Sequence, residues 1–217
     1  MSLPIAPSGI NEPDSSQPES QAAVTPAPLA PAGAVPAEQP QLSVPALLRE
    51  IVETIILTVI IYAAVNFATG RFKVEGSSME PSIYPNEYVL VDKLSYRLGQ
   101  PQRGDVVVFN YPRATEKDFI KRVIGLPGET VSIANGVVSI NGQALKEPYI
   151  AAPPVSGGEW TLSPNQYFVM GDNRNNSSDS RSWGPLDRKY LIGKAVVTYW
   201  PPELWGLIPH FTYADTP

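Results

Sequence analysis

One apolar segment constrains this chain more than any other feature. Residues 46–70 are helical in composition, and their charge-free part runs for 17 residues, from Thr54 to Gly70. A membrane-spanning helix needs about 17–25 mostly apolar residues, and nearly every face of this segment is apolar. We therefore predict one transmembrane helix over residues 46–70, with Arg49, Glu50 and Glu53 in the headgroup region. The alternative is a helix buried in a protein core.

The residues before this segment differ sharply in composition. Residues 1–45 hold ten of the 24 prolines, four acidic residues and no Lys or Arg. Such a segment buries too little apolar surface to offset the entropy lost on ordering, so we predict a disordered, Pro-rich tail. It lacks a basic region at its start, so we do not expect a signal or transit peptide.

The residues after the apolar segment predict a mainly β domain over 71–217. β-branched runs alternate there with turn signals, of which Asn135-Gly136 is typical of a tight hairpin. A second Asn-Gly, at 141–142, predicts another tight turn. Helical periodicity is confined to short pieces around residues 86–98. We predict a coiled, antiparallel β-sheet domain with a small accessory hairpin region at about 129–168.

Composition excludes several kinds of chemistry. The absence of cysteine excludes disulfides, thiolate metal sites and a cysteine nucleophile. His210 is the only histidine, so a zinc site with two histidines is impossible, and a hydrolytic site must use His210, a carboxylate or a lysine as its base. The net charge of −5 leaves no basic excess for nucleic-acid binding. We expect neither a metal nor a cofactor, and no nucleic-acid partner.

Four short segments of the β domain combine glycine with polar side chains. They are VEGSSMEP at 74–81, RGD at 103–105, FIKRVIGLPG at 119–128 and GDNRNNSSDSR at 171–181. Taken singly, each has an ordinary structural explanation, such as a turn or a surface ion pair. Lys121 differs in having apolar sequence neighbours, although a lysine that extends from an edge strand into solvent is the commoner case.

Taken together, these segments indicate a serine–lysine pair. A serine hydroxyl is a weak nucleophile and needs an adjacent base. A lysine can be that base only when it is neutral, and burial among apolar groups lowers its pKa. Ser-Lys pairs are a recognised variant of the serine-hydrolase arrangement. Because only one histidine is present, Lys121 with a serine of the first segment explains the pattern most simply.

In this order, and preceded by an apolar span, the four segments resemble the sequence boxes of type I signal peptidases. The likeness covers roughly residues 46–210. It implies that Ser78, directly before methionine, is the nucleophile of a serine endopeptidase and that Lys121 is its general base. It also implies that the Ser177 hydroxyl holds this lysine in place.

The same resemblance implies structural roles for further residues of the boxes. It implies an ion-pair cluster beneath the site for Arg122, Asp179 and Arg181, and a supporting loop for Asp172, Asn173 and Arg174.

One position departs from the pattern of many type I signal peptidases. Some members carry a serine or threonine two residues before the nucleophile, and its hydroxyl donates to the oxyanion; here that residue is Gly76. Ser77 is a poor substitute, because adjacent side chains of an extended segment point to opposite faces. We expect the oxyanion hole to use the Ser78 backbone N–H and a second donor that the sequence does not identify.

The resemblance implies that the enzyme removes signal peptides from exported preproteins after a small-x-small motif. Its partners would be these preproteins and the lipid bilayer, and the enzyme would lie upstream of or beside a secretion translocon. It would be a single-pass protein of a bacterial plasma membrane or a thylakoid membrane. Residues 1–48 would be cytoplasmic or stromal, with the catalytic domain exoplasmic or lumenal. The basic residues that flank the span, Arg49 before it and Arg71 and Lys73 after it, do not favour this orientation.

Two other functions fit parts of the pattern. Self-cleaving repressors share a Ser-Lys β fold, but they would need an N-terminal DNA-binding domain where this chain has an apolar span. A catalytically silent, membrane-tethered binding module is the second, and intact Ser78, Lys121 and Ser177 argue against it. The segment that contains Trp200 and Trp205 either lies at the membrane interface, where tryptophan is favoured, or packs into the core.

Overall fold

The structure, a computed structural model, describes residues 43–213. The tail predicted over residues 1–45 therefore lies almost wholly outside the described residues.

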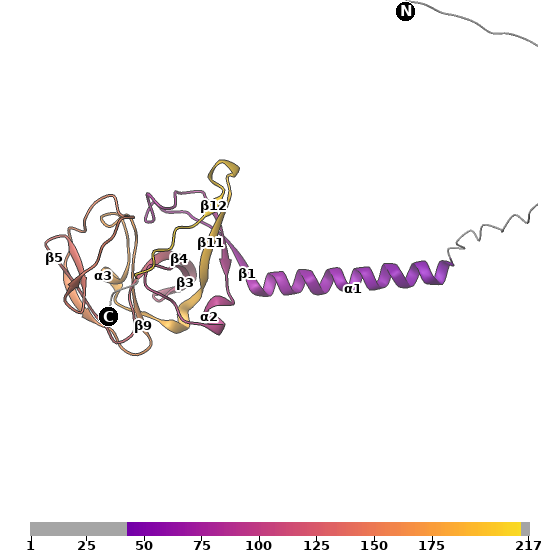
Figure 1. The fold of residues 1–217 in the computed structure, drawn as a ribbon, viewed down its shortest axis with the longest axis horizontal. Coiled ribbons are helices and arrows are strands. Elements are labelled where there is room, and N and C mark those ends of the chain that lie inside the picture. Colours follow the sequence, from indigo (N-terminus) through magenta and orange to yellow (C-terminus); the bar gives the residue numbers. More distant parts are fainter. Residues whose placement is uncertain (1–42, 214–217) are drawn as a thin grey trace, which may run out of the picture. The chain divides into compact units, whose positions relative to one another are not determined.

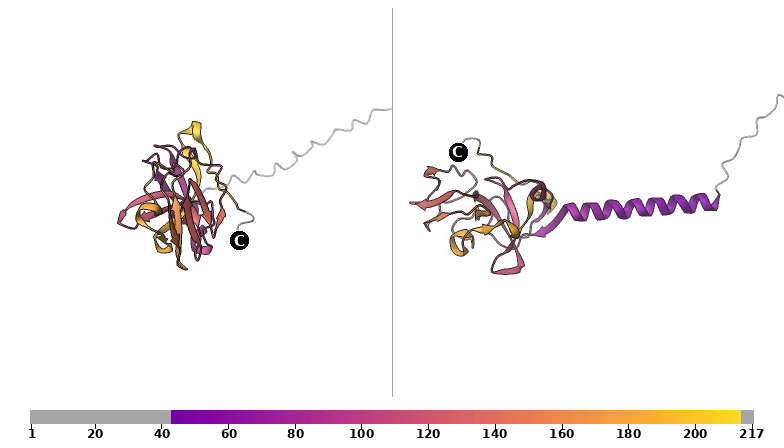
Figure 2. Two further views of the ribbon diagram at one scale, coloured as in Figure 1. Left: turned by 90° about the vertical axis from the view of Figure 1, so that its left-hand side faces the viewer. Right: turned by 90° about the horizontal axis from the view of Figure 1, so that it is seen from below.

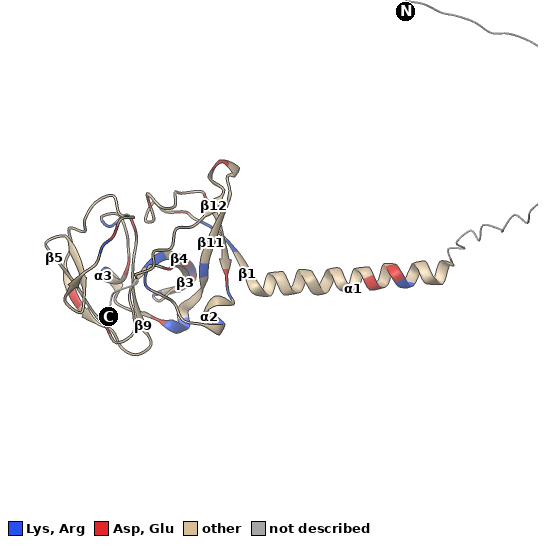
Figure 3. Cartoon of the chain, in the orientation of Figure 1, with Lys and Arg blue, Asp and Glu red and all other residues tan. Residues whose placement is uncertain are grey.

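The apolar segment forms a single helix, α1, of 25 residues from Val44 to Ala68 (Figure 1). None of its residues is buried by the rest of the protein, which argues against a core helix. Among residues 43–213 it is the one helix long and apolar enough to cross a membrane. Its charged residues all lie near its N-terminal end (Figure 3). The helix ends two residues earlier than predicted, because Thr69 and Gly70 pair with Asp92 and Val91.

The remainder is mainly β, which confirms the predicted fold class. The larger sheet has eight strands, all antiparallel, in the order β1-β2-β11-β3-β4-β9-β10, with β12 paired to β11. Figures 1 and 2 show the β domain from three sides. Its strands are β1 (Thr69–Lys73), β2 (Tyr88–Asp92), β3 (Val106–Tyr111), β4 (Ala114–Gly125), β9 (Gln166–Met170), β10 (Leu186–Asp187), β11 (Leu191–Trp200) and β12 (Gly206–Leu207).

The region predicted as an accessory hairpin is a separate four-stranded sheet in the order β7-β6-β5-β8. Its strands are β5 (Thr130–Ala134), β6 (Val137–Ile140), β7 (Gln143–Ala144) and β8 (Gly158–Thr161). Asn135 and Gly136 join β5 to β6 with positive φ at both residues, as the predicted tight hairpin requires. The second Asn-Gly pair, at 141–142, turns β6 into β7 in the same way.

The apolar run in β3 is explained by burial on both faces of the large sheet. Val106 and Val108 belong to one cluster of buried side chains, whereas Val107 and Phe109 belong to another. Successive side chains of a strand point to opposite faces, so these clusters cover opposite faces of the sheet. A third cluster, which includes Ile124 of β4, joins the two sheets. Buried side chains therefore pack against both faces of the central strands.

Between α1 and residue 213, helical structure is limited to four short pieces. They are α2 (Ser95–Leu98), α3 (Ser180–Trp183) and the 3-10 turns η1 (Arg188–Tyr190) and η2 (Pro202–Leu204). The predicted helical piece around residues 86–98 corresponds to α2, whereas nothing in the sequence pattern predicted α3.

Residues 208–213, which we call the C-terminal strap, pack back over the domain. Gly104 has a φ of +90°, and a side chain there would collide with the backbone carbonyl of Phe211. By contrast, Trp200 and Trp205, which precede the strap, are 53% and 77% exposed. Core packing of these two tryptophans is therefore excluded.

Candidate active site

Ser78 lies in a turn between β1 and β2, and the loop after β9 forms hydrogen bonds with this turn. The N–H of Asn173 donates to the Ser78 carbonyl at 3.0 Å, and its Nδ2 donates to the Ser77 carbonyl at 3.1 Å. The Ser77 hydroxyl accepts a hydrogen bond from Asn176 Nδ2 at 2.8 Å. Ser77 and Ser78 occupy a bend and the start of a turn, so the expectation of an extended segment there was wrong. The loop thus supports the nucleophile segment.

Lys121 is brought to Ser78 by β4, which lies between β3 and β9. It pairs with Val107 of β3, and its side chain is buried, with the residue only 4% exposed. Its Nζ lies 2.7 Å from Ser78 Oγ and 2.7 Å from the carbonyl oxygen of Ile120. The structure therefore joins the predicted nucleophile and base, 43 residues apart in the chain, in one hydrogen bond.

Burial also sets the electrostatic state of this lysine. It lowers the pKa of Lys121 from 10.5 to about 8, because the ammonium loses its hydration, while the carboxylates of Asp179 and Asp172 oppose the shift. In the described part of the chain, no carboxylate forms an ion pair with Lys121 Nζ. An appreciable fraction of the side chain is thus neutral near pH 8 and able to accept a proton.

Ser177 lies close to this pair without bonding to it. Its Oγ is buried and has no hydrogen-bond partner within residues 43–213. A side chain at Gly171 would collide with both Ser177 Oγ and the Ser78 carbonyl oxygen, so these two atoms lie close together beside the bare backbone of Gly171. The predicted contact between Ser177 and Lys121 is therefore absent from this arrangement, although the hydroxyl is available.

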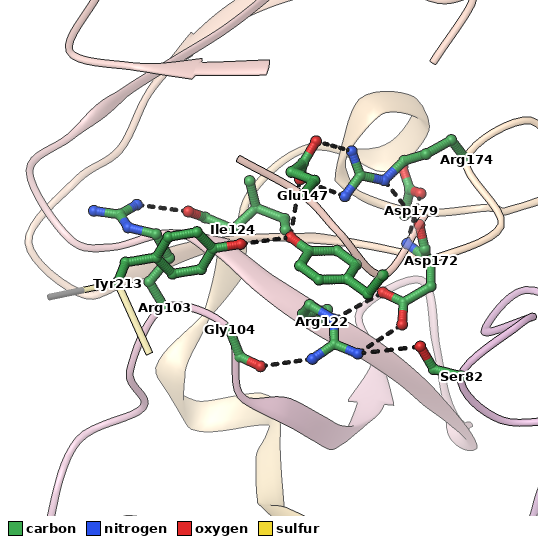
Figure 4. Close-up of polar contacts among 12 residues, drawn as sticks. Ser82, Arg103, Gly104, Arg122, Ile124, Glu147, Asp172, Arg174, Asp179 and Tyr213 are labelled. Atoms are coloured by element: carbon green, nitrogen blue, oxygen red, sulfur yellow. Dashed lines mark hydrogen bonds and ion pairs between the residues drawn. The ribbon is translucent and has the colours of Figure 1, made fainter. Parts of the chain in front are cut away.

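A fully buried ion pair lies beside Lys121 in the chain. Arg122 Nε and Nη2 donate to the two carboxylate oxygens of Asp172 at 2.8 and 2.6 Å, and both side chains have no exposed surface. Arg122 Nη1 donates to the Gly104 carbonyl at 2.8 Å (Figure 4) and to the Pro209 carbonyl at 2.9 Å. The sequence grouped Arg122 with Asp179; the structure corrects this, since its carboxylate partner is Asp172.

Asp179 instead pairs with Arg181 at 2.8 Å. Its carboxylate also accepts the N–H of Gly171 at 3.1 Å, and Arg181 Nη2 donates to the Arg174 carbonyl. Asp179 caps the start of α3, where it accepts the backbone N–H of Arg181. These bonds fold the segment 171–181 back on itself next to Ser78.

Sequence patterns missed two residues of this network, Glu147 and Tyr149. Glu147 accepts both terminal nitrogens of Arg174, at 2.6 and 2.5 Å, and also the Tyr149 hydroxyl (Figure 4). The Tyr149 ring lies 4.3 Å from the Arg122 guanidinium, and its hydroxyl accepts from Tyr213 of the strap. Both residues lie in a loop outside the four predicted segments, and no local pattern marks them.

His210 has a structural position in the strap. Its Nδ1 accepts the N–H of Val106 at 3.2 Å, and burial lowers its pKa to about 4, so it is neutral at working pH. No hydrogen bond joins it to Ser78 in the described structure. Within residues 43–213, no group of three or more His, Cys, Asp or Glu side chains is placed to hold a metal ion.

Comparison with known proteins gives consistent matches. A family model described as "Signal peptidase, peptidase S26" matches residues 48–200. Probable signal peptidase I-2 of Synechocystis is 42% identical over 166 residues, 73% of this chain and 76% of that protein. Signal peptidase I of Leptolyngbya laminosa is 41% identical over 177 residues, 77% of this chain and 86% of that protein. A crystal structure of a signal peptidase I from Enterococcus faecalis matches with a TM-score of 0.41 and 34% identity, covering 44% of this chain and 96% of that one.

We expect Asp179→Ala to act mainly through stability. The change leaves Arg181, whose side chain is 8% exposed, without its carboxylate, and it removes the acceptor of the Gly171 N–H. A loss of about 3–5 kcal/mol in the free energy of unfolding lowers the melting temperature by roughly 10 °C in a domain of this size. Thermal melts of the purified full chain measure this shift.

Asp187→Ala is the matched control for this measurement. Asp187 pairs with Lys189 at 3.8 Å, and both side chains are well exposed, so its loss changes the melting temperature by less than about 2 °C. If Asp179→Ala melts like the wild type but loses activity, Asp179 acts on the reacting groups directly.

Proposed function

This chain belongs to the signal peptidase family, peptidase S26, and we propose that it is a serine endopeptidase in which Ser78 attacks and Lys121 is the general base. Its substrates are signal-peptide-bearing preproteins, cleaved after a small-x-small motif. The observation that carries the mechanism is the 2.7 Å hydrogen bond between Lys121 Nζ and Ser78 Oγ in surroundings that depress the lysine pKa.

The hydrogen-bonding groups of a neutral lysine fit the role of general base. A neutral amine has one lone pair and two N–H donors. The lone pair can accept the Ser78 hydroxyl proton, and one N–H can donate to the Ile120 carbonyl at 2.7 Å. The second N–H then needs an acceptor, and the buried, unpartnered Ser177 hydroxyl is a suitable one. We propose that Ser177 orients Lys121 by a small rotation that makes this bond.

The reaction then proceeds in two halves. Lys121 takes the Ser78 proton while Oγ attacks the scissile carbonyl, and the resulting oxyanion is stabilised by the Ser78 N–H. Collapse of the tetrahedral intermediate breaks the peptide bond, and the Lys121 ammonium gives its proton to the departing amine. The neutral Lys121 next deprotonates a water, which hydrolyses the acyl-enzyme. The Ser78 N–H suits its role because no hydrogen bond within residues 43–213 uses it.

The edge of β4 offers a place for the substrate backbone. The part of β4 before Lys121 pairs with β3 on one side, whereas pairing with β9 begins only at Arg122. A free strand edge next to the base can accept an extended peptide as an additional strand. Alternate side chains of that peptide then point the same way, which suits recognition of small residues at two alternate positions.

The chain is a single-pass membrane protein, and α1 is its span. We propose that residues before α1 face the cytoplasm or stroma and that the β domain faces the exoplasmic or lumenal side. Preproteins emerge on that side, and the enzyme would lie upstream of or beside a translocon. The proposal is supported by the family's function, since an enzyme that trims exported proteins must meet them where they emerge.

Substitution of three serines tests the proposed roles. We expect Ser78→Ala to abolish cleavage, Ser177→Ala to lower turnover by about 10²-fold, and Ser77→Ala to have a mild effect, since misplacing a general base loses most of its contribution. Detergent-solubilised full chain is incubated with a preprotein, and N-terminal sequencing of the product identifies the cleaved bond. An active Ser78→Ala enzyme with an inactive Ser77→Ala enzyme would reverse the choice of nucleophile.

The pH dependence tests the base. Because only the neutral amine accepts a proton, activity should rise with pH through one ionisation near 8, the depressed pKa of Lys121. Lys121→Arg keeps the positive charge but cannot deprotonate, since arginine titrates above about 12, so it should be as inactive as Lys121→Ala. Pre-steady-state and steady-state rates from pH 6 to about 10 measure both effects. Substantial activity of Lys121→Arg would mean that Lys121 is only an electrostatic anchor.

Protease accessibility tests the orientation. Protease added outside sealed right-side-out vesicles should digest the β domain and spare the residues before α1, because the membrane shields only the cytoplasmic side. Antibodies against an N-terminal tag and a C-terminal tag show which end of the chain is digested. Vesicles opened with detergent are the control. Survival of the C-terminal tag in sealed vesicles would contradict the proposed topology.

A further inference from the structure

Basic residues gather where α1 gives way to the β domain. Arg71 and Lys73 follow the helix in β1, and Lys93 and Arg97 come from the end of β2 and from α2. The antiparallel pairing of β1 with β2 brings the two segments together, since Thr69 lies opposite Asp92. We call these four basic residues the collar. All four follow the charge-free run that ends at Gly70, so they lie at the boundary of the apolar span.

Local contacts hold three of the four collar residues against the last turn of α1. The Arg97 guanidinium lies 4.3 Å from the centre of the Phe67 ring. Arg71 Nη2 donates to Asn66 Oδ1 at 3.4 Å, and the backbone N–H of Lys93 donates to the Ala68 carbonyl at 2.9 Å. Arg71, Lys93 and Arg97 are therefore held at the depth where a membrane-spanning helix meets the lipid headgroups.

A second set of bonds holds α2, and with it Arg97, in place. Arg188 Nη2 donates to the carbonyls of Tyr96 and Gly99 at 3.2 and 2.8 Å. The Asp92 carboxylate accepts the backbone N–H groups of Leu94 and Ser95 and the Ser95 hydroxyl. Asp92 is the acidic residue nearest to the collar in the β1–β2 pairing, and its oxygens are thus occupied by α2.

The collar has no carboxylate partner, unlike several other cationic side chains of the domain. Arg103, Arg122, Arg174, Arg181 and Lys194 each form an ion pair at 2.5–2.8 Å. None of the four collar residues forms one within residues 43–213. At the opposite end of α1, Arg49 pairs with Glu53, and Glu50 leaves that flank acidic. Positive charge is therefore left unneutralised at one end of the span only.

We infer that the collar binds the phosphate of an anionic phospholipid headgroup in the leaflet that surrounds the C-terminal end of α1. Guanidinium groups bind phosphate oxygens in bidentate fashion, and several cations close together favour a headgroup with no ammonium of its own. Phe67 and Leu98, which flank Arg97 in space and in sequence, are 59% and 88% exposed, and acyl chains would cover them. Free phosphate could make the polar contacts but would leave these apolar side chains in water. The inference rests on α1 as a membrane span and does not depend on the Ser-Lys mechanism.

Native mass spectrometry of the full chain in detergent micelles tests this site. With equal amounts of phosphatidylglycerol and phosphatidylcholine, the wild type should retain phosphatidylglycerol at least about fivefold more often, because each cation near an anionic headgroup contributes a factor of roughly five. Arg71→Gln/Arg97→Gln, which removes two of the four collar cations, should lower this preference by about 25-fold. The matched control is Arg113→Gln/Lys117→Gln, which removes two exposed cations outside the collar and should keep it.

Several results would overturn the inference. The first is a wild type that binds the two lipids equally, and the second is an equal loss of the lipid preference in both double variants. The third is displacement of phosphatidylglycerol by inorganic phosphate at about 50 mM, which would indicate a site for soluble anions. Arg97→Gln alone, expected to lower the preference by about fivefold, keeps the test valid if the double variant does not fold. Cleavage is not measured, so failure here leaves the peptidase proposal intact, and an inactive enzyme does not affect this result.

Discussion

The buried ion pair between Arg122 and Asp172 is the interaction on which the site depends. Neither side chain has exposed surface, so each charge must be compensated inside the protein. Asp172 accepts two hydrogen bonds, and the carbonyls of Gly104 and Pro209 take the remaining Nη1 donors. Removal of either partner would leave an uncompensated buried charge, which typically costs several kcal/mol. One guanidinium therefore ties β4, the loop after β9 and the C-terminal strap together.

This pair also explains how two adjacent cations of β4 differ chemically. Arg122 has a bidentate carboxylate and stays charged, whereas Lys121 is buried without such a partner and has its pKa lowered to about 8. Successive side chains of a strand point to opposite faces, so β4 places one cation in the ion-pair network and the other beside Ser78. The same strand thus provides a fixed charge and a base that can become neutral.

Local patterns in the sequence predicted the elements that depend on local physics. The apolar run over residues 46–70, the β-branched run of β3 and the Asn135-Gly136 turn each carry a signal that short-range periodicity or φ preference determines. The order of the four segments and the residue types in them predicted that Ser78 and Lys121 would lie close together. Sequence spacing could not decide whether Asp172 or Asp179 neutralises Arg122, because both aspartates lie in the same polar segment. Glu147 and Tyr149 join the network through contacts with residues that are distant in the sequence. Such contacts produce no periodic pattern in the sequence.

The collar also bears on the orientation of the span. A count of flanking basic residues would place the side that carries Arg71 and Lys73 in the cytoplasm, but such counts apply to short loops, and long folded domains cross membranes largely regardless of charge. Here the flank leads into a β domain of well over 100 residues, and pairing of β1 with β2 adds Lys93 and Arg97 to the same place. Positive charge that is organised by a folded domain at a helix end is a property of the folded protein. It therefore carries little weight as a topology signal, and the proposed exoplasmic domain is compatible with it.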